Sequence, residues 1–388
     1  MQKAHVALIL GVFVSACGGE EEAAPPPQTP PAATTPPPAE TAKAEAPAPK
    51  IIPGLGDLEA TTNKALVEAL NAHDAKKVAS LYSDDALITV PGVWINHGEV
   101  KGRADIEKST QQFFDTFKDV KFWVNRILVK QDVAALEYGW SGTQSGEFLG
   151  VKGSEKQVGV VGVSLVAYDS EGLIKQENRY SDLGTIFTQL GYSKGKARPI
   201  PTAAGATETF VSKGTPDEQK NLAASKQIDA AFESKKEADF LAPLTDDIEW
   251  TDYSQPEASK GKDAAKKFFG TFTKAFPDGK STVTAGYGAG DFVVHESTFI
   301  GTQKGALGPI PATKKPVQIH SVDILQFKDG KVVKGATYAN SIELVGQLGL
   351  FKPPAASPAG AGAKPGDKPA SGSVGAKADS APGAAPKK

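Results

Sequence analysis

Three polar residues alternate along one predicted strand and could form an acid–base site. Asn178, Tyr180 and Asp182 are each two residues apart, so their side chains share one face of a regular strand. A carboxylate such as Asp182 can act as a general base, and the hydroxyl of Tyr180 and the amide of Asn178 can donate hydrogen bonds to an enolate-like oxygen. The sequence therefore offers Asp182 and Tyr180 as candidate catalytic residues.

A later stretch of the chain matches this one and tests the catalytic hypothesis. Its corresponding residues are Ala336, Tyr338 and Asn340. Asn340 has no titratable carboxyl group, so the second copy has no general base at this position. Asp and Asn both cap helices well, and each of these residues precedes a predicted helix. Helix capping is the favoured interpretation of Asp182 and Asn340, and catalysis by Asp182 is the alternative.

Further polar and aromatic side chains could line a pocket. His295 and His320 replace the apolar residues of the first copy, although a lone histidine on an apolar face is more often a hydrogen-bonded core residue. His320 and Asp323 are three residues apart, so a regular strand puts them on opposite faces and argues against a His–Asp dyad. The complete set of pocket candidates is Asn178, Tyr138, Trp140, His295, His320, Tyr338, Asn340 and Trp250.

The elements that must position these residues occur twice, because the chain is a tandem repeat. Residues 132–146 and 291–305 are identical at six of fifteen positions, and matched motifs extend from Asp84-Asp85 and Asp246-Asp247 to Gln189-Leu190-Gly191 and Gln347-Leu348-Gly349. We therefore predict a first domain over 51–195, a linker over 196–215 and a second domain over 216–352. Residues 18–50 are predicted to be a disordered Pro/Ala-rich tether, and 353–388 a disordered Ala/Gly/Pro/Lys tail.

Each copy reads as helices followed by strands. In the first copy, helical spacing predicts helices over 58–70, 75–82 and 104–117, and beyond residue 121 the apolar period changes to two. Gly172 and Gly330 lie in short polar turns between apolar runs, which indicates hairpins. The fold class is α+β, with two tandem cone-shaped domains, each a curved antiparallel sheet covered by about three helices.

The order of these motifs resembles that of SnoaL-like polyketide cyclases, within the nuclear-transport-factor-2-like group. The resemblance implies a cone with an apolar cavity, acid–base chemistry on a small apolar ligand, and an acidic residue near the end of the last strand, which is Asp182 here. It also implies that the two copies pair through their sheets inside one chain. Family members often have His after the Gly-Thr pair, where this chain has Gln144 and Gln303, so we read these motifs as structural turns.

The beginning of the chain carries a targeting signal. Residues 1–17 contain a short apolar stretch and end in Val14-Ser15-Ala16-Cys17, which resembles the lipobox of bacterial lipoproteins. Cys17 is the only cysteine, so it cannot form an intramolecular disulfide. The resemblance implies lipidation of Cys17, with Gly18 favouring the outer membrane, and predicts a membrane-anchored protein of the cell envelope that faces the periplasm.

Composition and motifs exclude several functions. The net charge is −2 with no basic stripe, which argues against nucleic-acid binding. There is no dinucleotide loop, P-loop or nucleophile elbow, and the five histidines lack ligand spacing, so we expect neither a cofactor nor a metal. The function that we predict is binding of a small apolar ligand without turnover. The alternatives are a cyclase- or isomerase-like enzyme that uses Asp182, and a protein-interaction module.

Overall fold

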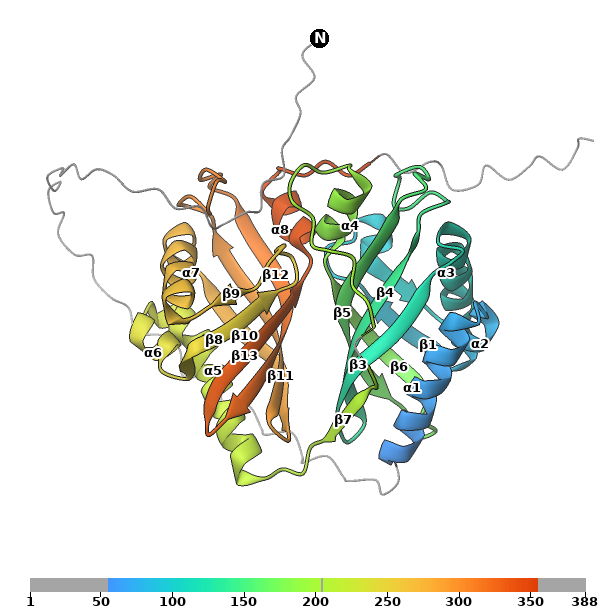
Figure 1. Ribbon diagram of the computed structural model, residues 1–388, viewed down its shortest axis with the longest axis horizontal. Helices are drawn as coiled ribbons and strands as arrows, with labels where there is room; N and C mark the ends of the chain where they lie inside the picture. Colours follow the sequence, from blue (N-terminus) through green and yellow to red (C-terminus); the bar gives the residue numbers. More distant parts are fainter. Residues whose placement is uncertain (1–54, 204, 355–388) are drawn as a thin grey trace, which may run out of the picture. The chain divides into compact units, whose positions relative to one another are not determined.

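The structure, a computed structural model, describes residues 55–203 and 205–354 (Figure 1). The predicted signal segment, Cys17, the tether and nearly all of the predicted tail lie outside these residues. Among the residues that are described, no helix is both long and apolar enough to cross a membrane.

The first domain follows the predicted order of helices and then strands. Its elements are α1 (Leu55–Asn71), α2 (Ala75–Ser80), β1 (Tyr82–Thr89), the short 3-10 helix η1 (Ile95–Gly98), β2 (Glu99–Lys101), α3 (Arg103–Thr116), β3 (Lys121–Lys130), β4 (Val133–Thr143), β5 (Gln157–Tyr168), β6 (Ile174–Ser181), α4 (Leu183–Leu190) and β7 (Glu208–Val211).

The second domain repeats this order. Its elements are α5 (Pro216–Ser234), α6 (Glu237–Leu241), β8 (Leu244–Asp252), β9 (Ser259–Lys260), α7 (Lys262–Ala275), β10 (Lys280–Ala289), β11 (Phe292–Thr302), β12 (Pro316–Lys328), β13 (Lys331–Ala339) and α8 (Ser341–Gln347).

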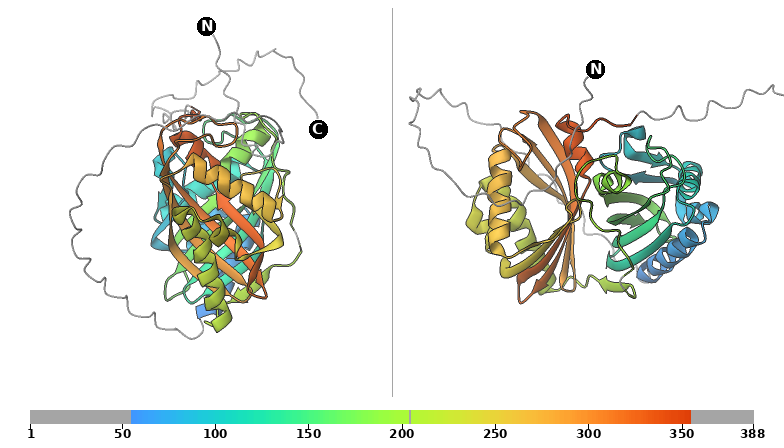
Figure 2. Two further views of the ribbon diagram at one scale, coloured as in Figure 1. Left: turned by 90° about the vertical axis from the view of Figure 1, so that its left-hand side faces the viewer. Right: turned by 45° about the horizontal axis from the view of Figure 1, so that its top comes forward.

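Each domain has one sheet, and the two sheets have matching strand orders. The first is β2-β1-β6-β5-β4-β3-β7 and the second is β10-β11-β12-β13-β8-β9. In each domain three helices cover one face of the sheet, α1–α3 in the first and α5–α7 in the second (Figure 1), and the sheets curve around these helices (Figure 2). The predicted α+β class with two cone-shaped domains is confirmed.

The sheets differ from the prediction in two details. β1 pairs with β6 in parallel, and β8 with β13 likewise, so neither sheet is wholly antiparallel. β7 lies inside the predicted linker and pairs in parallel with β3, extending the first sheet by one strand. β1 and β8 come long before their partners β6 and β13 in the chain, so no hairpin joins these pairs and parallel pairing is open to them.

Local sequence explains where the helices that adjoin the strands begin and end. α4 begins after Asp182, whose side chain accepts hydrogen bonds from the backbone of Gly184 and Thr185, and it ends at Gly191 in the left-handed conformation. α5 begins with a capping box formed by Thr215 and Glu218. The caps therefore fix the residue at which each of these two helices begins.

The two faces of each sheet have different neighbours. We call the face that packs on the helices of its own domain the inner face, and the space between them the cone; the opposite face is the outer face. The inner faces form separate apolar cores with the helices of each domain. Outer-face residues of both sheets share one further apolar cluster, which includes Leu128, Val163, Val294 and Ile324.

Candidate functional site

Two of the three alternating polar residues of β6 point to the outer face, away from the cone. Tyr180 and Asn178 pair in register with Val163 and Leu165, which belong to the cluster between the sheets. The Asn178 amide donates to Glu296 Oε1 at 3.1 Å, and the Tyr180 hydroxyl also donates to Glu296. Burial and the neighbouring Glu296 carboxylate raise the pKa of Tyr180 well above its ordinary value. These side chains bond to the other domain.

Asp182 is a helix cap with a second partner. Its carboxylate accepts from the backbone N–H groups of Gly184 at 3.2 Å and Thr185 at 2.7 Å, and from the Thr185 hydroxyl at 2.7 Å. It also accepts from Ser341 of the second domain, through the backbone N–H at 2.9 Å and the hydroxyl at 2.6 Å. Asp182 is 1% exposed. The geometry matches the capping interpretation rather than a base that faces a substrate.

The candidates at the end of β13 have the corresponding positions in the second copy. Asn340 caps α8, donates to the carbonyl oxygen of Pro91 at 3.0 Å and accepts from the backbone N–H of Leu183 at 3.3 Å. The Tyr338 hydroxyl donates to Glu137 of the first domain. His320 also lies on the outer side, where its Nδ1 is 2.6 Å from Glu343 of α8. Like Asp182, these residues lie outside the cone.

Tyr138 and Trp140 do lie inside the first cone, where aromatic packing surrounds them. The Trp140 ring centroid is 5.1 Å from that of Phe113 on α3 and 5.1 Å from that of Phe117, which follows α3. The Tyr138 ring covers Gly162 so closely that a Cβ at Gly162 would lie 2.6 Å from it. The first cone is therefore filled along this strip by its own side chains.

The first cone also contains a charge pair that the sequence did not single out, in which the carboxylate is buried and the guanidinium is partly exposed. Arg179 Nε and Nη2 donate to the Glu177 carboxylate at 2.7 and 2.9 Å, and Tyr82 and Ser164 donate to it at 2.6 and 2.7 Å. Burial disfavours the charged carboxylate, but the Arg179 guanidinium outweighs it and holds the pKa of Glu177 below its ordinary value. A carboxylate with four donors and a lowered pKa is a structural anion rather than a general base.

The second cone contains a different polar cluster, centred on His295. His295 Nε2 is 3.1 Å from Asp323 Oδ2 on β12 and 3.2 Å from Asp229 Oδ2 on α5, and its Nδ1 shares a hydrogen bond with the Ser225 hydroxyl. Burial opposes protonation of the ring, but the two carboxylates raise the pKa of His295 above its ordinary value. Burial raises the pKa of Asp229. We call Asp229, His295 and Asp323 the Asp–His–Asp cluster.

Trp250 joins this cluster through a chain of hydrogen bonds. Its ring lies over Gly335, where a Cβ would meet the ring at 2.5 Å, and its Nε1 donates to the Thr337 hydroxyl at 2.9 Å. Thr337 in turn donates to Asp323. Trp250 and His295 are thus pocket candidates that the structure connects in the second cone, through Thr337 and Asp323.

The inner faces of the two domains differ in how well they are covered. Ile88, Trp140, Val160 and Ser164 of the first domain are buried. Their counterparts in the second domain have intermediate exposure: Trp250, Phe299, Ile319 and Asp323. Ser321 also has intermediate exposure, whereas Gly162 at the matching position is buried. We call these five residues the open strip. Solvent reaches the inner face of the second cone at positions where the first cone is closed.

Strand register determines why Glu177, Arg179 and Asp323 point into the cones, although none of them was a predicted site residue. Residues 177 and 179 point into the cone because they pair with Val166 and Ser164, after a register shift between Ala167 and Tyr168. Asp323 lies directly opposite His295 on the neighbouring strand. His320 and Asp323 lie on opposite faces of β12, as predicted. The same alternation places Asp323 on the face that carries His295.

The Gly-Thr-Gln motifs have the structural role that was predicted. Gln144 and Gln303 are fully buried and bond to the backbone of the loops that follow β4 and β11. Within residues 55–203 and 205–354, no group of three or more His, Cys, Asp or Glu side chains could hold a metal ion.

Comparisons with known proteins agree with this architecture. The family model of SnoaL-like polyketide cyclase matches residues 60–190 and 223–348. AclR from Streptomyces galilaeus is 24% identical, covering 35% of this chain and 99% of its own, with a TM-score of 0.32. TsrD from Streptomyces laurentii is 20% identical, covering 34% of this chain and 97% of its own, with a TM-score of 0.32. An LEH-like epoxide hydrolase from M. tuberculosis is 14% identical, covering 34% of this chain and 92% of its own, with a TM-score of 0.30. No curated protein matches the chain.

Proposed function

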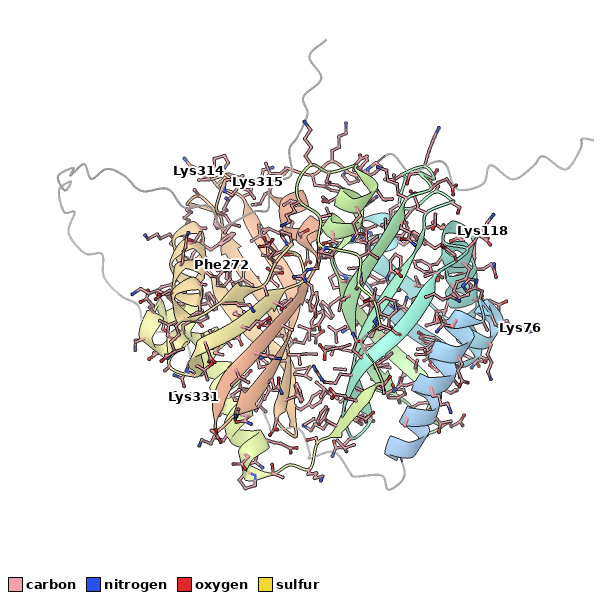
Figure 3. All side chains as sticks on the ribbon, in the orientation of Figure 1. Lys76, Lys118, Phe272, Lys314, Lys315 and Lys331 are labelled. Carbon is pink, nitrogen blue, oxygen red and sulfur yellow. The ribbon has the colours of Figure 1, made fainter. Side chains whose placement is uncertain are left out.

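Because the chain belongs to the SnoaL-like polyketide cyclase family, we propose that its second cone binds a small, largely apolar ligand and does not turn it over. The observation that carries this proposal is the open strip. At five aligned positions the inner face is accessible in the second domain and buried in the first. Phe272, which Figure 3 places on α7, packs on Phe299 with 4.8 Å between the ring centroids, and the two rings supply an apolar wall.

The absence of turnover is supported by the state of the titratable groups. Asp182, the candidate base, accepts five hydrogen bonds outside the cones. In the second cone both ring nitrogens of His295 already face protein partners. A general base needs a lone pair within reach of the substrate proton. The lone pairs of Asp182 and His295 are directed at other groups of the protein.

We test this proposal by giving the second cone the filling of the first. In the first domain Tyr138 faces Gly162 across the sheet, and in the second Ser297 faces Ser321, with the two hydroxyls 3.1 Å apart. The double variant Ser297→Tyr/Ser321→Gly is expected to lose any small molecule that native mass spectrometry detects on the full chain. Loss of affinity should be at least about tenfold, because a ring of this size occupies the ligand's volume.

The matched control opens the first cone instead. Tyr138→Ser/Gly162→Ser makes the reverse exchange, and it should leave the mass of the bound species and the affinity unchanged. Retention of the ligand by the filled second cone, with unfolding by denaturant as in the parent, would rule this cone out as the binding site.

The proposed setting is the bacterial envelope. Its support is the sequence Val14-Ser15-Ala16-Cys17 at the end of an apolar stretch. A lipid chain on Cys17 would hold the protein at the membrane by a tether rather than by a spanning helix. We expect the Cys17→Ser protein to move from the membrane fraction to the soluble fraction on cell fractionation, whereas Ser15→Ala, which keeps a small residue at that position, should remain with the membranes.

We also propose that the two domains pair with each other through their outer faces. The support is a set of reciprocal contacts, Tyr180 with Glu296 and Tyr338 with Glu137, together with the caps Asp182 and Asn340. This pairing uses the surface that a protein-interaction role would otherwise need. It leaves the cones as the surfaces for a ligand.

A further inference from the structure

The two cones differ in charge as well as in coverage. In the first cone the Glu177 carboxylate is paired with the Arg179 guanidinium, so the pair is neutral. The second domain has Gly335 and Thr337 at the positions of Glu177 and Arg179, and it has Asp323 and Asp229 at the positions of Ser164 and Val67. The second cone thus lacks both members of the ion pair and has two carboxylates at other positions of its inner wall, with no arginine among them.

Among the described residues, the ion-pair partner of both carboxylates is His295. With both carboxylates ionised, the Asp–His–Asp cluster carries a net charge of −1 when the imidazole is protonated and −2 when the imidazole is neutral. The lysines that Figure 3 labels in this domain lie at the ends of strands: Lys314 and Lys315 precede β12, and Lys331 begins β13. Arg198 lies over the Tyr253 ring and bonds to backbone carbonyl oxygens, so it does not neutralise the cluster.

The hydrogen-bond count shows that this cluster lacks one donor. His295 Nε2 can carry one hydrogen, and it faces Asp323 Oδ2 at 3.1 Å and Asp229 Oδ2 at 3.2 Å. Asp229 is 9% exposed, and its Oδ2 is buried with no hydrogen-bond donor. A donor that approached Asp323 from the open strip would let the imidazole N–H turn to Asp229, so that both carboxylates would be satisfied.

The surroundings of Asp323 suit a particular kind of donor. Asp323 is itself part of the open strip, with its side chain 15% exposed. The Trp250 ring is held next to it by the bond to Thr337. A carboxylate beside a partly exposed indole ring is the combination that attracts ammonium groups, by charge and by cation–π interaction.

We propose that the ligand of the second cone carries a cationic nitrogen on an apolar body, with Asp323 as its counter-ion and Trp250 beside it. This assignment rests on the proposed ligand-binding function and adds the charge of the ligand. The ammonium supplies a permanent cation to a cone whose carboxylates have only His295 as their ion-pair partner, and the apolar body lies along Phe299 and Ile319.

The test compares ligands that share one body and differ in the head group. 2-Phenylethylamine, 2-phenylethanol and phenylacetate are titrated into the full chain at neutral pH by calorimetry, and the series is repeated with cyclohexyl and naphthyl bodies. The amine of at least one body should bind about tenfold or more tighter than its alcohol, and the carboxylate weakest, as expected for a charge-assisted bond.

Variants connect this preference to the site. Asp323→Asn keeps an acceptor for Thr337 and should abolish the preference for the amine while leaving the affinity of the alcohol unchanged. The control is Glu249→Gln, which removes an exposed carboxylate of β8 that is paired with Lys260, and it should change neither affinity. A preference for the amine that survives in Asp323→Asn contradicts the assignment.

The remaining outcomes separate the two proposals. Equal binding of amine and alcohol, both lost in Ser297→Tyr/Ser321→Gly, overturns the cationic ligand and leaves the ligand-binding function standing. If no member of any series binds and no endogenous molecule is retained by the full chain, both proposals fall.

Discussion

Replacing Arg179 by methionine is expected to lower the free energy of unfolding by about 3 kcal/mol. The substitution leaves the Glu177 carboxylate, with its side chain 5% exposed, without its cationic partner. A buried charge that loses its partner is far more costly than the same pair replaced by neutral groups. We take the lower end of the usual range because the Arg179 side chain is itself 38% exposed. Urea unfolding of the full chain measures the change.

A double-mutant cycle separates the lost partner from lost packing. Glu177→Gln/Arg179→Met removes both charges and should recover at least half of the loss, because no unpaired carboxylate remains. Glu249→Gln, on an exposed pair, should change stability by less than about 0.5 kcal/mol. If Arg179→Met is no more destabilised than Glu249→Gln, the buried pair does not stabilise the first domain.

The same pair predicts a pH dependence. In the parent, the pKa of Glu177 is lower in the folded state than the ordinary value of 4.5. Its contribution is therefore fully present above that value and is lost as the pH falls through the folded pKa. In Arg179→Met the Tyr82 and Ser164 donors remain, but the guanidinium no longer offsets burial, so the folded-state pKa of Glu177 should rise. The difference between the two proteins should accordingly be largest at neutral pH and narrow as the pH falls through the acidic range.

Replacing Asp182 by alanine is expected to cost about 2–4 kcal/mol. The loss combines a helix cap, worth about 1 kcal/mol, with the buried donors of Ser341 that would be left without an acceptor. Asp182→Asn keeps one acceptor oxygen and should cost about half as much. Thermal and urea unfolding of the three proteins measure these differences.

The Asp182 series also distinguishes capping from catalysis. Asn cannot act as a general base, so a catalytic Asp182 would make the Asn and Ala variants equally inactive while their stabilities differed. With capping, ligand binding by the second cone should be unchanged in Asp182→Asn. The Asn at the matching position of the second copy, Asn340, already performs this capping role on α8.

Most of the fold could be predicted from the sequence because its signals are local or repeated. The predicted helix over 104–117, the Gly-Thr-Gln turns and the helix that follows Asp182 depend on neighbours within a few residues. Two copies of each signal made the domain pattern visible. The parallel pairing of β1 with β6 depends on residues far apart in the chain, and no local pattern encodes it.

The site was harder to predict because it depends on strand register. A slip of one residue exchanges the two faces of a strand. In β6 the register shift near Tyr168 turns Glu177 and Arg179 inward and Tyr180 outward. His295 was expected to point inward, and it does; its partners Asp229 and Asp323 come from another helix and another strand, and sequence spacing does not show that they meet.

The covalent joining of the two cones has a consequence for how they can diverge. In a symmetric dimer of identical chains every substitution enters both binding sites at once. In this chain a substitution at Ser297 or Thr337 alters the second cone alone, because the matching residues of the first cone, Tyr138 and Arg179, are separate positions of the sequence. One half can therefore act as a fixed support, and the other is free to acquire new specificity at no cost to its neighbour's core.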